Sequence, residues 1–400
     1  MSFPLPPLLL NSEPGSYAQR TFQTRIPRIV DNVIATNDYP AEIVQALRAL
    51  REEIGGGALE PLREASDDQE FWNAQAREHL EKTWLDLPWY WAEAFFYRRV
   101  LEATHYFRDG DFCRRDPFAP VKRAELQPDR APRALNAALE ALPRDPAAAF
   151  DAFLHASLWG NRADLSHLAI KGRAQTFAAR SEQSRRDERA NLLVDDSARV
   201  WEFLRGARGR VDFICDNAGA ELCFDLALVD FLLRANLAAE IVLHLKPQPM
   251  FVSDAMIQDA LTSLDVFDNS TTELRQLAQR LARARNAGRL VLREHPFWVT
   301  GFFFHALPDD LRATLAQASL VISKGDANYR RLIGDCHWAP TTRFEDTVAH
   351  FPAPVVALRT LKAELIVGLR AGQAERLHAQ DAEWLVNGKR GVIQFAGENG

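Results

Sequence analysis

The fold is decided by residues 210–254, RVDFICDNAGAELCFDLALVDFLLRANLAAEIVLHLKPQPMFVSD. Two short runs rich in β-branched residues, 210–215 and 240–245, flank a longer stretch, 221–235, whose apolar residues fit a helix. A strand, a crossover helix and a second strand form a unit in which the two strands lie parallel in one sheet. Residues 210–254 therefore predict an α/β fold with a parallel sheet.

The same alternation continues towards the C-terminus. Further strands are predicted at 289–294, 320–324 and 354–359, and the clearest further helix is predicted at 270–287. Together with the first two runs, this gives five predicted strands, whose order in the sheet a single sequence does not specify. The region from residue 193 to 400 is therefore predicted to be a Rossmann-like α/β/α parallel-sheet domain.

Residues 1–192 have a different character, which predicts a mainly helical N-terminal domain. Residues 1–30 contain several prolines and are expected to be extended. From about residue 38, apolar residues recur at three- and four-residue spacing, as in EIVQALRALREEI at 42–54. The segment 70–103 carries many Trp, Phe and Tyr residues at helical spacing, a pattern more typical of a buried core than of a ligand site.

Composition excludes several classes of function. The 400-residue chain has a formal net charge of −6, which argues against nucleic acid as a partner, although a few local cations suffice for a small phosphorylated ligand. The four cysteines form no CxxC pair, so zinc or iron–sulfur binding by thiolates is not expected. We find no signal peptide and no apolar run long enough to cross a membrane, and we expect a cytoplasmic protein without membrane attachment or an obligate protein partner.

Polar clusters follow four of the five predicted strands. The carboxyl ends of parallel strands meet at one edge of the sheet, where ligands bind in such folds. Because all four clusters are expected at that edge, together they indicate a site. The clusters are DNAGAE at 216–221, KPQPMFVSD at 246–254, SKGDANYR at 323–330 and RTLK at 359–362.

Asp216, Asn217 and Asp254 supply oxygen atoms of the kind that a hard divalent cation prefers, with water completing its shell. The alternative for Asp216 and for Asp254 is a helix N-cap, since aspartate favours that position and a helical pattern follows each residue. Two adjacent oxygen donors at 216 and 217, with a second carboxylate after the next strand, favour the metal hypothesis.

Basic residues in the last two clusters suit a phosphate group. Lys362 is predicted to begin a helix, and Arg359 offers a planar fork for phosphate oxygens. The alternatives are a strand-end salt bridge for Arg359 and a solvated helix lysine for Lys362. Lys389 lies in the glycine-containing turn NGKRG, which on sequence alone is more typical of a surface turn.

The four clusters, in this order, resemble those of the damage-control phosphatase family, formerly a domain of unknown function. Arg359-Thr360-Leu361-Lys362 is similar to the Arg-Thr-x-Lys motif of its subfamily III, a branch with sugar-phosphate phosphatases and an acidic-residue methyltransferase. Residues 160–166, GNRADLS, are similar to a Gly-Asn-x-x-Asp-Leu-Ser segment of the family, with Arg162 a slight departure. The resemblance extends from about residue 20 to the end of the chain.

The resemblance implies a set of site residues. Metal binding is implied for Asp216, Asn217 and Asp254, and Asp326 is a further catalytic candidate. The implied cofactor is a divalent cation, Mn²⁺, Mg²⁺, Co²⁺ or Ni²⁺. The residues implied to contact substrate are Asp216, Asn217, Arg359, Thr360, Leu361, Lys362, Ala363 and Lys389, with Asn161 and Asp164 from the N-terminal half.

The expected function is metal-dependent hydrolysis of small phosphorylated metabolites, such as fructose 1-phosphate or fructose 6-phosphate. The attacking group is either a metal-activated water or a carboxylate such as Asp216. One alternative is an S-adenosylmethionine-dependent methyltransferase of protein carboxyl groups. The turn after the first predicted strand has acidic residues where such a nucleotide site favours glycines. A non-catalytic binding protein on the same fold is the other alternative.

Overall fold

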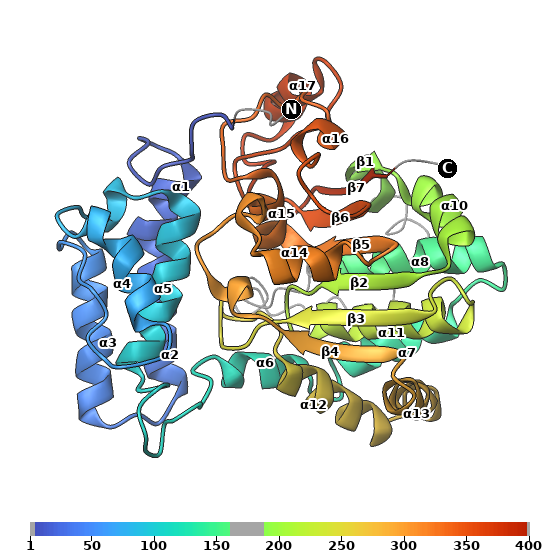
Figure 1. The fold of residues 1–400 in the computed structure, drawn as a ribbon, viewed down its shortest axis with the longest axis horizontal. Helices are drawn as coiled ribbons and strands as arrows, with labels where there is room; N and C mark the ends of the chain where they lie inside the picture. The colour runs from blue at the N-terminus through green and yellow to red at the C-terminus, as the bar shows by residue number, and fades with distance from the viewer. Residues whose placement is uncertain (1–4, 161–187, 398–400) are drawn as a thin grey trace.

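The computed structural model describes residues 5–160 and 188–397. It has two parts, a layer of helices from the first hundred residues and a seven-stranded sheet covered by helices on both faces (Figure 1). The predicted α/β class with a helical N-terminal region is confirmed. Asn161 and Asp164 lie outside the described residues.

The sheet order is β1-β7-β6-β5-β2-β3-β4, and every neighbouring pair is parallel except β6 and β7. The five predicted strands are the five that run in one direction, each within a residue or two of its predicted bounds. The two strands that the sequence did not reveal, β1 and β7, run in the opposite direction. The strands are β1 Leu192–Asp195, β2 Arg210–Ile214, β3 Glu240–Leu245, β4 Leu290–Glu294, β5 Leu320–Lys324, β6 Val355–Thr360 and β7 Gly391–Ala396.

The helical layer begins earlier than expected. Residues 1–30 were predicted to be extended, but a helix starts at Tyr17, where the hydroxyl of the N-cap residue Ser16 accepts a hydrogen bond from the Gln19 amide. Pro27 lies in the first turn of α2, where a missing N–H is tolerated. The layer consists of α1 Tyr17–Arg20, a π-turn at Thr21–Arg25, α2 Ile26–Thr36, α3 Ala41–Ile54, α4 Gln69–Ala76 and α5 Trp89–Ala103, with 3₁₀ turns at Arg77–His79 and Trp84–Asp86.

The remaining helices surround the sheet. Figure 1 shows α8 and α11 behind the sheet and α14 and α15 in front of it. Side chains of α7 and α8 share one buried cluster with α11 and the central strands, so these two helices pack with the sheet. The helices are α6 Ala119–Glu125, α7 Ala131–Glu140, α8 Pro146–Trp159, α10 Ser197–Ala207, α11 Ala220–Arg234, α12 Ile257–Asp268, α13 Thr272–Asn286, α14 Asp309–Leu315, α15 Gly325–Ile333, α16 Phe344–Thr347 and α17 Gln373–Gln380, with 3₁₀ turns at Pro296–Val299 and Phe304–Ala306.

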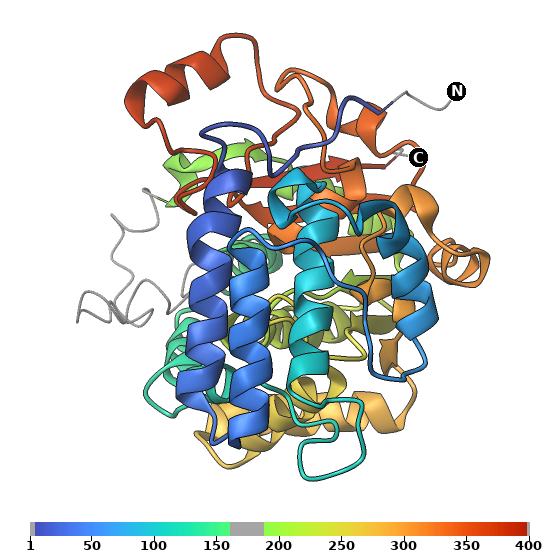
Figure 2. The same cartoon turned by 90° about the vertical axis from the view of Figure 1, so that its left-hand side faces the viewer.

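The helical layer stands against the carboxyl ends of the central strands. The arrows of β3 and β4 point towards it in Figure 1, and Figure 2 shows its long helices side by side in front of the sheet. The aromatic segment 70–103 provides its core, as predicted, with Trp72, Trp84 and Trp89 almost fully buried. The edge of the sheet where ligands are expected therefore faces another layer of the protein.

Candidate active site

The loops after β2 and β3 are joined by backbone hydrogen bonds. The Ala255 amide donates to the Asp216 carbonyl (2.7 Å), and the Ala218 amide donates to the Ser253 carbonyl (2.6 Å). The Ser253 hydroxyl also donates to the Asn217 side-chain oxygen (2.5 Å). These bonds place Asp254 directly across from Asn217, so the structure brings the three predicted metal ligands together.

Neither aspartate caps a helix, which removes the alternative raised by the sequence. The N-cap of α11 is Gly219, and the first amide of that helix, at Ala220, donates to the Glu125 carboxylate (2.9 Å). The N-cap of α12 is Met256. Neither Asp216 nor Asp254 is therefore the N-cap of the helix that follows it.

Asp254 is a buried acid without a hydrogen-bond donor. It is 1% exposed, and neither carboxylate oxygen accepts a hydrogen bond from any described residue. The nearest cation is the Lys246 ammonium, 3.4 Å from Oδ2. Burial raises the pKa of Asp254 to about 6, against the opposing effect of Lys246. Lys246 compensates one buried carboxylate, and the nearby Asp216 carboxylate adds a second negative charge that is costly without a further cation.

Asp216 lies in the same environment. Burial, together with the charges of Glu221 and Asp254, raises the pKa of Asp216 well above its usual range. The carboxylate also lies against the backbone of Gly325, the first residue of α15. Gly325 has a φ of +81°, and a Cβ atom there would lie 1.9 Å from Asp216 Oδ2. The glycine of the SKGD segment is therefore required both by its backbone conformation and by the approach of this carboxylate.

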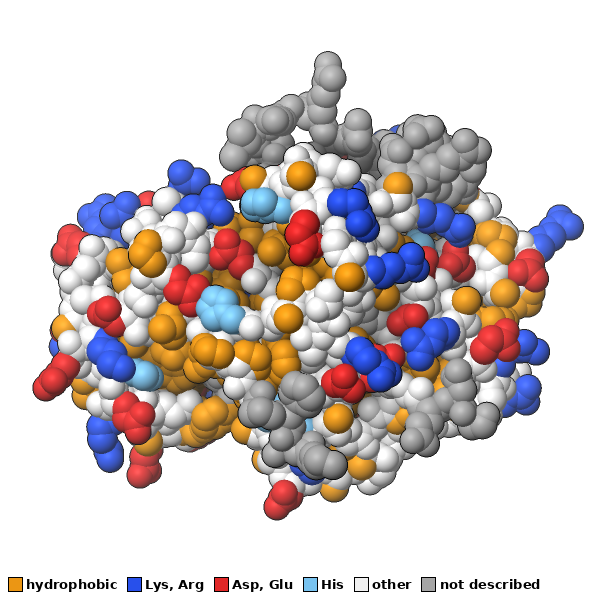
Figure 3. Space-filling view, turned by 90° about the horizontal axis from the view of Figure 1, so that it is seen from above, with side chains coloured by type: hydrophobic (Ala, Val, Ile, Leu, Met, Phe, Trp, Pro, Cys, Tyr) orange, Lys and Arg blue, Asp and Glu red, His pale blue; other side chains and the backbone are white. Residues whose placement is uncertain are grey.

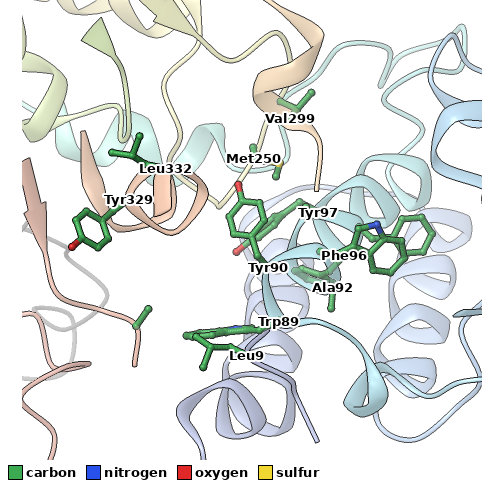
Figure 4. Packing of buried hydrophobic residues seen from close by; sticks show 14 of the residues in the cluster. Leu9, Trp89, Tyr90, Ala92, Phe96, Tyr97, Met250, Val299, Tyr329 and Leu332 are labelled. Atoms are coloured by element: carbon green, nitrogen blue, oxygen red, sulfur yellow. The ribbon is translucent and has the colours of Figure 1, made fainter. Parts of the chain in front are cut away.

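The loop that carries Asp254 is strained. Phe251 and Val252 have φ values of 46° and 69°, a region that a β-branched residue such as valine rarely adopts. Two tyrosines of α5 pack on the Phe251 ring, with centroid separations of 5.7 Å for Tyr90 and 5.0 Å for Tyr97. Figure 4 shows Tyr90 pointing from α5 towards Met250 of the same loop. Such strain persists where surrounding contacts hold the chain, and it is commonly found at functional sites.

A second group of charged side chains adjoins Asp216, Asn217 and Asp254, and sequence reasoning missed it. The Lys324 ammonium is fully buried and donates to Glu221 Oε1 (2.9 Å), Asp225 Oδ1 (2.8 Å) and the Ser157 carbonyl (2.9 Å). Glu221 Oε2 accepts from the Asn217 amide (2.9 Å), which connects this group to the predicted ligands. Glu221 and Lys324 occur within the quoted polar clusters, but their contact depends on the fold and leaves no spacing signal in the sequence.

Arg359 forms the strand-end salt bridge that the sequence left open as its alternative. Its side chain is fully buried, and its Nε donates to Asp326 Oδ1 (2.7 Å). The two terminal nitrogens donate to the carbonyls of Leu365 (2.8 Å) and Ala363 (3.2 Å). The guanidinium also stacks over the Tyr329 ring. Arg359 therefore shapes the loop that follows β6, and its bonds point into the protein.

The segment after β6 is not a helix, so the prediction that Lys362 begins one is wrong. The next helix, α17, begins only at Gln373. Asp326 Oδ1 accepts a hydrogen bond from the Lys362 backbone amide (3.0 Å), in addition to its bond with Arg359. The two internal bonds of Arg359 to loop carbonyls hold this segment in an irregular path. The Lys362 side chain is only partly buried, whereas Thr360, Leu361 and Ala363 are buried.

The Lys389 turn lies beside this segment. The Leu361 amide donates to the Arg390 carbonyl (2.9 Å), and the Gly388 amide donates to the Leu361 carbonyl (3.0 Å). The Lys389 side chain is exposed, and its ammonium lies 3.5 Å from Asp381. The backbone thus brings the 387–390 turn next to residues 360–362, while the lysine side chain reaches the surface.

The donor set fits a divalent cation that is completed by water. Among residues 5–160 and 188–397, no group of three or more His, Cys, Asp or Glu side chains is arranged as a ready-made metal site. Asp216 and Asp254 supply two carboxylates and Asn217 an amide oxygen, so the protein offers an incomplete shell. The raised pKa values of both acids and the lack of donors to Asp254 are the physical signs that a positive charge is favoured here.

Comparison with known proteins places the chain in a family. The family model of the damage-control phosphatase ARMT1-like domain matches residues 21–377. This chain belongs to the damage-control phosphatase ARMT1-like family. It is 33% identical to damage-control phosphatase ARMT1 of Danio rerio, over 98% of this chain and 97% of that protein. The protein of the same name from Rattus norvegicus is 32% identical, over 98% of this chain and 99% of that protein.

The damage-control phosphatase fold is also seen in a solved structure. A DUF89 family protein from Pyrococcus horikoshii superposes with a TM-score of 0.55 at 14% identity, covering 95% of this chain and 98% of that one.

In the part of this chain that the structure describes, no helix is both long enough and apolar enough to span a membrane. The face in Figure 3 has Lys and Arg side chains dispersed among Asp and Glu.

Proposed function

We propose that this damage-control phosphatase is a metal-dependent hydrolase of small phosphomonoesters, and that sugar phosphates such as fructose 1-phosphate or fructose 6-phosphate are its substrates. The observation that carries the proposal is the pair of buried carboxylates, Asp216 and Asp254, which lie beside Asn217 at the carboxyl edge of the sheet with Lys246 as the nearest cation to Asp254. Membership of the damage-control phosphatase ARMT1-like family supports the hydrolase class.

Charge balance supports a divalent cation beside these residues. The connected buried group contains four carboxylates, of Asp216, Glu221, Asp225 and Asp254, and two ammonium groups, of Lys246 and Lys324. The carboxylates outnumber the buried ammonium groups, although Lys362 also acts on Asp216 and Lys122 on Asp254, so a further cation would offset negative charge here. Asp216, Asn217 and Asp254 would hold Mn²⁺, Mg²⁺, Co²⁺ or Ni²⁺.

A bound cation would polarise the phosphoryl oxygens and activate a nucleophile. Three hydrogen bonds orient the Asn217 side chain for this site. Its amide nitrogen donates to Asp216 and Glu221, and its amide oxygen accepts from the Ser253 hydroxyl. Asn328 holds the end of β2 in place, since its amide donates to the carbonyls of Cys215 (3.1 Å) and Lys324 (2.9 Å). The nucleophile is either water or the Asp216 carboxylate.

Lys362 would contact the phosphoryl group, with Asp326 and Arg359 as positioning residues. Asp326 accepts from the Lys362 amide, and Arg359 fixes the carbonyls of residues 363 and 365. The ammonium of Lys362 then offsets negative charge on the phosphoryl oxygens in the transition state. Residues 360–363 would form the backbone of this phosphate contact, and the Lys389 turn would border it.

Release of inorganic phosphate from a sugar-phosphate panel, with each of the four metals and after chelation, tests the proposal. We expect metal-dependent turnover on at least one sugar phosphate. Saturable binding of S-adenosylmethionine, with no binding of phosphate or sugar phosphate, would instead support the carboxyl methyltransferase. Phosphate release at an unchanged rate after exhaustive chelation would contradict the metal requirement.

A further inference from the structure

The first helix of the chain is attached to the loop that carries Lys362. The backbone amide of Tyr17 donates to the Glu364 carboxylate (2.6 Å), two residues after Lys362. The Tyr17 ring packs edge-on against Trp89 of α5, with centroids 6.0 Å apart. Tyr17 is therefore held from two sides, by the helical layer and by the loop after β6.

The phenol of Tyr17 lies within electrostatic reach of four charged side chains from different parts of the fold. Burial raises the pKa of Tyr17, Glu93 and Asp326 raise it further, and Arg25 and Lys362 lower it. The net result is a pKa above the usual value, so the hydroxyl is protonated at neutral pH and can both donate and accept a hydrogen bond. Two of these four residues, Asp326 and Lys362, belong to the proposed phosphate contact.

Arg25 adds a positive charge on the same side. Its guanidinium lies 3.9 Å from Glu93 Oε1, and its side chain is 48% exposed while that of Glu93 is 1% exposed. Glu93 also accepts from Arg330 (2.5 Å), a buried residue of α15 that pairs with Asp335 as well. Glu93 thus forms ion pairs with both Arg25 and Arg330, and of these two arginines Arg25 is the one exposed to solvent.

We propose that Tyr17 and Arg25 form the wall of the substrate site that recognises the hydroxyl-bearing part of a sugar phosphate, beyond the phosphoryl group. This inference rests on the proposed function. The phosphoryl group is taken by the metal ligands and Lys362, which lie on loops of the sheet. The Tyr17 amide bonds to Glu364, two residues after Lys362, so the part of the substrate beyond the phosphoryl group would lie beside α1, where Tyr17 and Arg25 offer hydrogen-bond donors suited to sugar hydroxyls.

The test compares two substrates in Tyr17→Phe and Arg25→Gln. A sugar phosphate has hydroxyl groups, whereas p-nitrophenyl phosphate has none beyond the phosphoryl group. We expect kcat/KM for the sugar phosphate to fall about tenfold in each variant, the effect of losing one hydrogen bond to substrate, with p-nitrophenyl phosphate hydrolysis nearly unchanged. Arg28→Gln is the matched control, because Arg28 is exposed on α2, three residues after Arg25. It should leave both substrates unaffected.

The ratio between the two substrates separates recognition from a structural role. An equal loss for both substrates, or no loss for either, would overturn the inference. Calorimetric titration with sugar phosphate and with inorganic phosphate distinguishes failure of this inference from failure of the proposed function. If the wild-type protein releases no phosphate, the inference still requires that sugar phosphate bind more tightly than inorganic phosphate and that Tyr17→Phe remove the difference. Equal binding of the two ligands would refute it.

Discussion

Replacing Gly325 with alanine should disable the site while leaving the protein folded. The residue has a φ of +81°, which costs an L-amino acid roughly 1–2 kcal/mol. The reduced entropy of the unfolded chain offsets about 0.4–1 kcal/mol of that cost. Backbone strain alone therefore predicts a loss of stability of about 1 kcal/mol.

The larger effect concerns the Asp216 carboxylate. The new methyl carbon would lie 1.9 Å from Oδ2 and 2.2 Å from Cγ, whereas non-bonded carbon contacts are about 3.5 Å or longer. The carboxylate must therefore move by more than about 1 Å, and displacement of that size in a catalytic group can cost roughly 100-fold in rate. We expect kcat/KM to fall about 100-fold, equivalent to about 2.7 kcal/mol of transition-state stabilisation.

Gly288→Ala provides the matched control. Gly288 has a φ of +69°, and nothing lies within 4 Å of the position that a Cβ atom would take. Gly288→Ala should lower the free energy of unfolding in urea by the same ~1 kcal/mol, without loss of activity. Phosphate release at saturating Mn²⁺ is the second measurement. Wild-type turnover in Gly325→Ala, at any stability, would refute the argument that Asp216 must occupy this position.

Three further predictions concern the phosphate contact and the pH dependence of stability. Lys362→Ala should lower turnover and substrate affinity by roughly ten- to hundredfold, while Mn²⁺ affinity is retained and inorganic phosphate becomes a poor inhibitor; loss of Mn²⁺ binding would contradict this role. Arg359→Lys should cost about 1–3 kcal/mol in urea denaturation, because an ammonium cannot serve both loop carbonyls and Asp326; unchanged stability would count against its positioning role. Burial, with His305 and Arg312 nearby, lowers the pKa of His350 to about 3, so the unfolded chain binds more protons and stability should decline as pH falls from about 6.5 towards 3. His350→Asn should flatten this decline, and an identical pH profile would refute the assignment.

The parallel strands were predictable because their sequences are continuous apolar, β-branched runs bounded by polar turns. Of the two missed strands, β1 lacks that pattern, since it is the four-residue LLVD and is mostly only partly buried. The buried strand β7, GVIQFA, has an apolar run that is interrupted by Gln394. Convergence of the polar clusters was also predictable, since it follows from the direction of parallel strands. It brought Asp216, Asn217 and Asp254 together as expected.

Side-chain partners from distant parts of the chain were not predictable. The role of Arg359 depends on its reach to the carbonyls of residues 363 and 365 and to Asp326 on another element. Those bonds keep the segment from Lys362 onward out of the helix that its sequence suggested. The burial of Lys324 between Glu221 and Asp225 likewise requires two adjacent elements to be packed first.

Metal binding by wild-type protein and by Asp254→Asn is the most direct test of the central claim. Asparagine keeps the shape of the side chain but cannot carry the negative charge of the aspartate, whose pKa is raised to about 6 by burial. We expect calorimetric titration to show saturable Mn²⁺ binding in the wild type and none in the variant, with phosphate release lost in parallel and the circular dichroism spectrum unchanged. Undiminished Mn²⁺ binding and phosphate release in a folded Asp254→Asn variant would contradict the account.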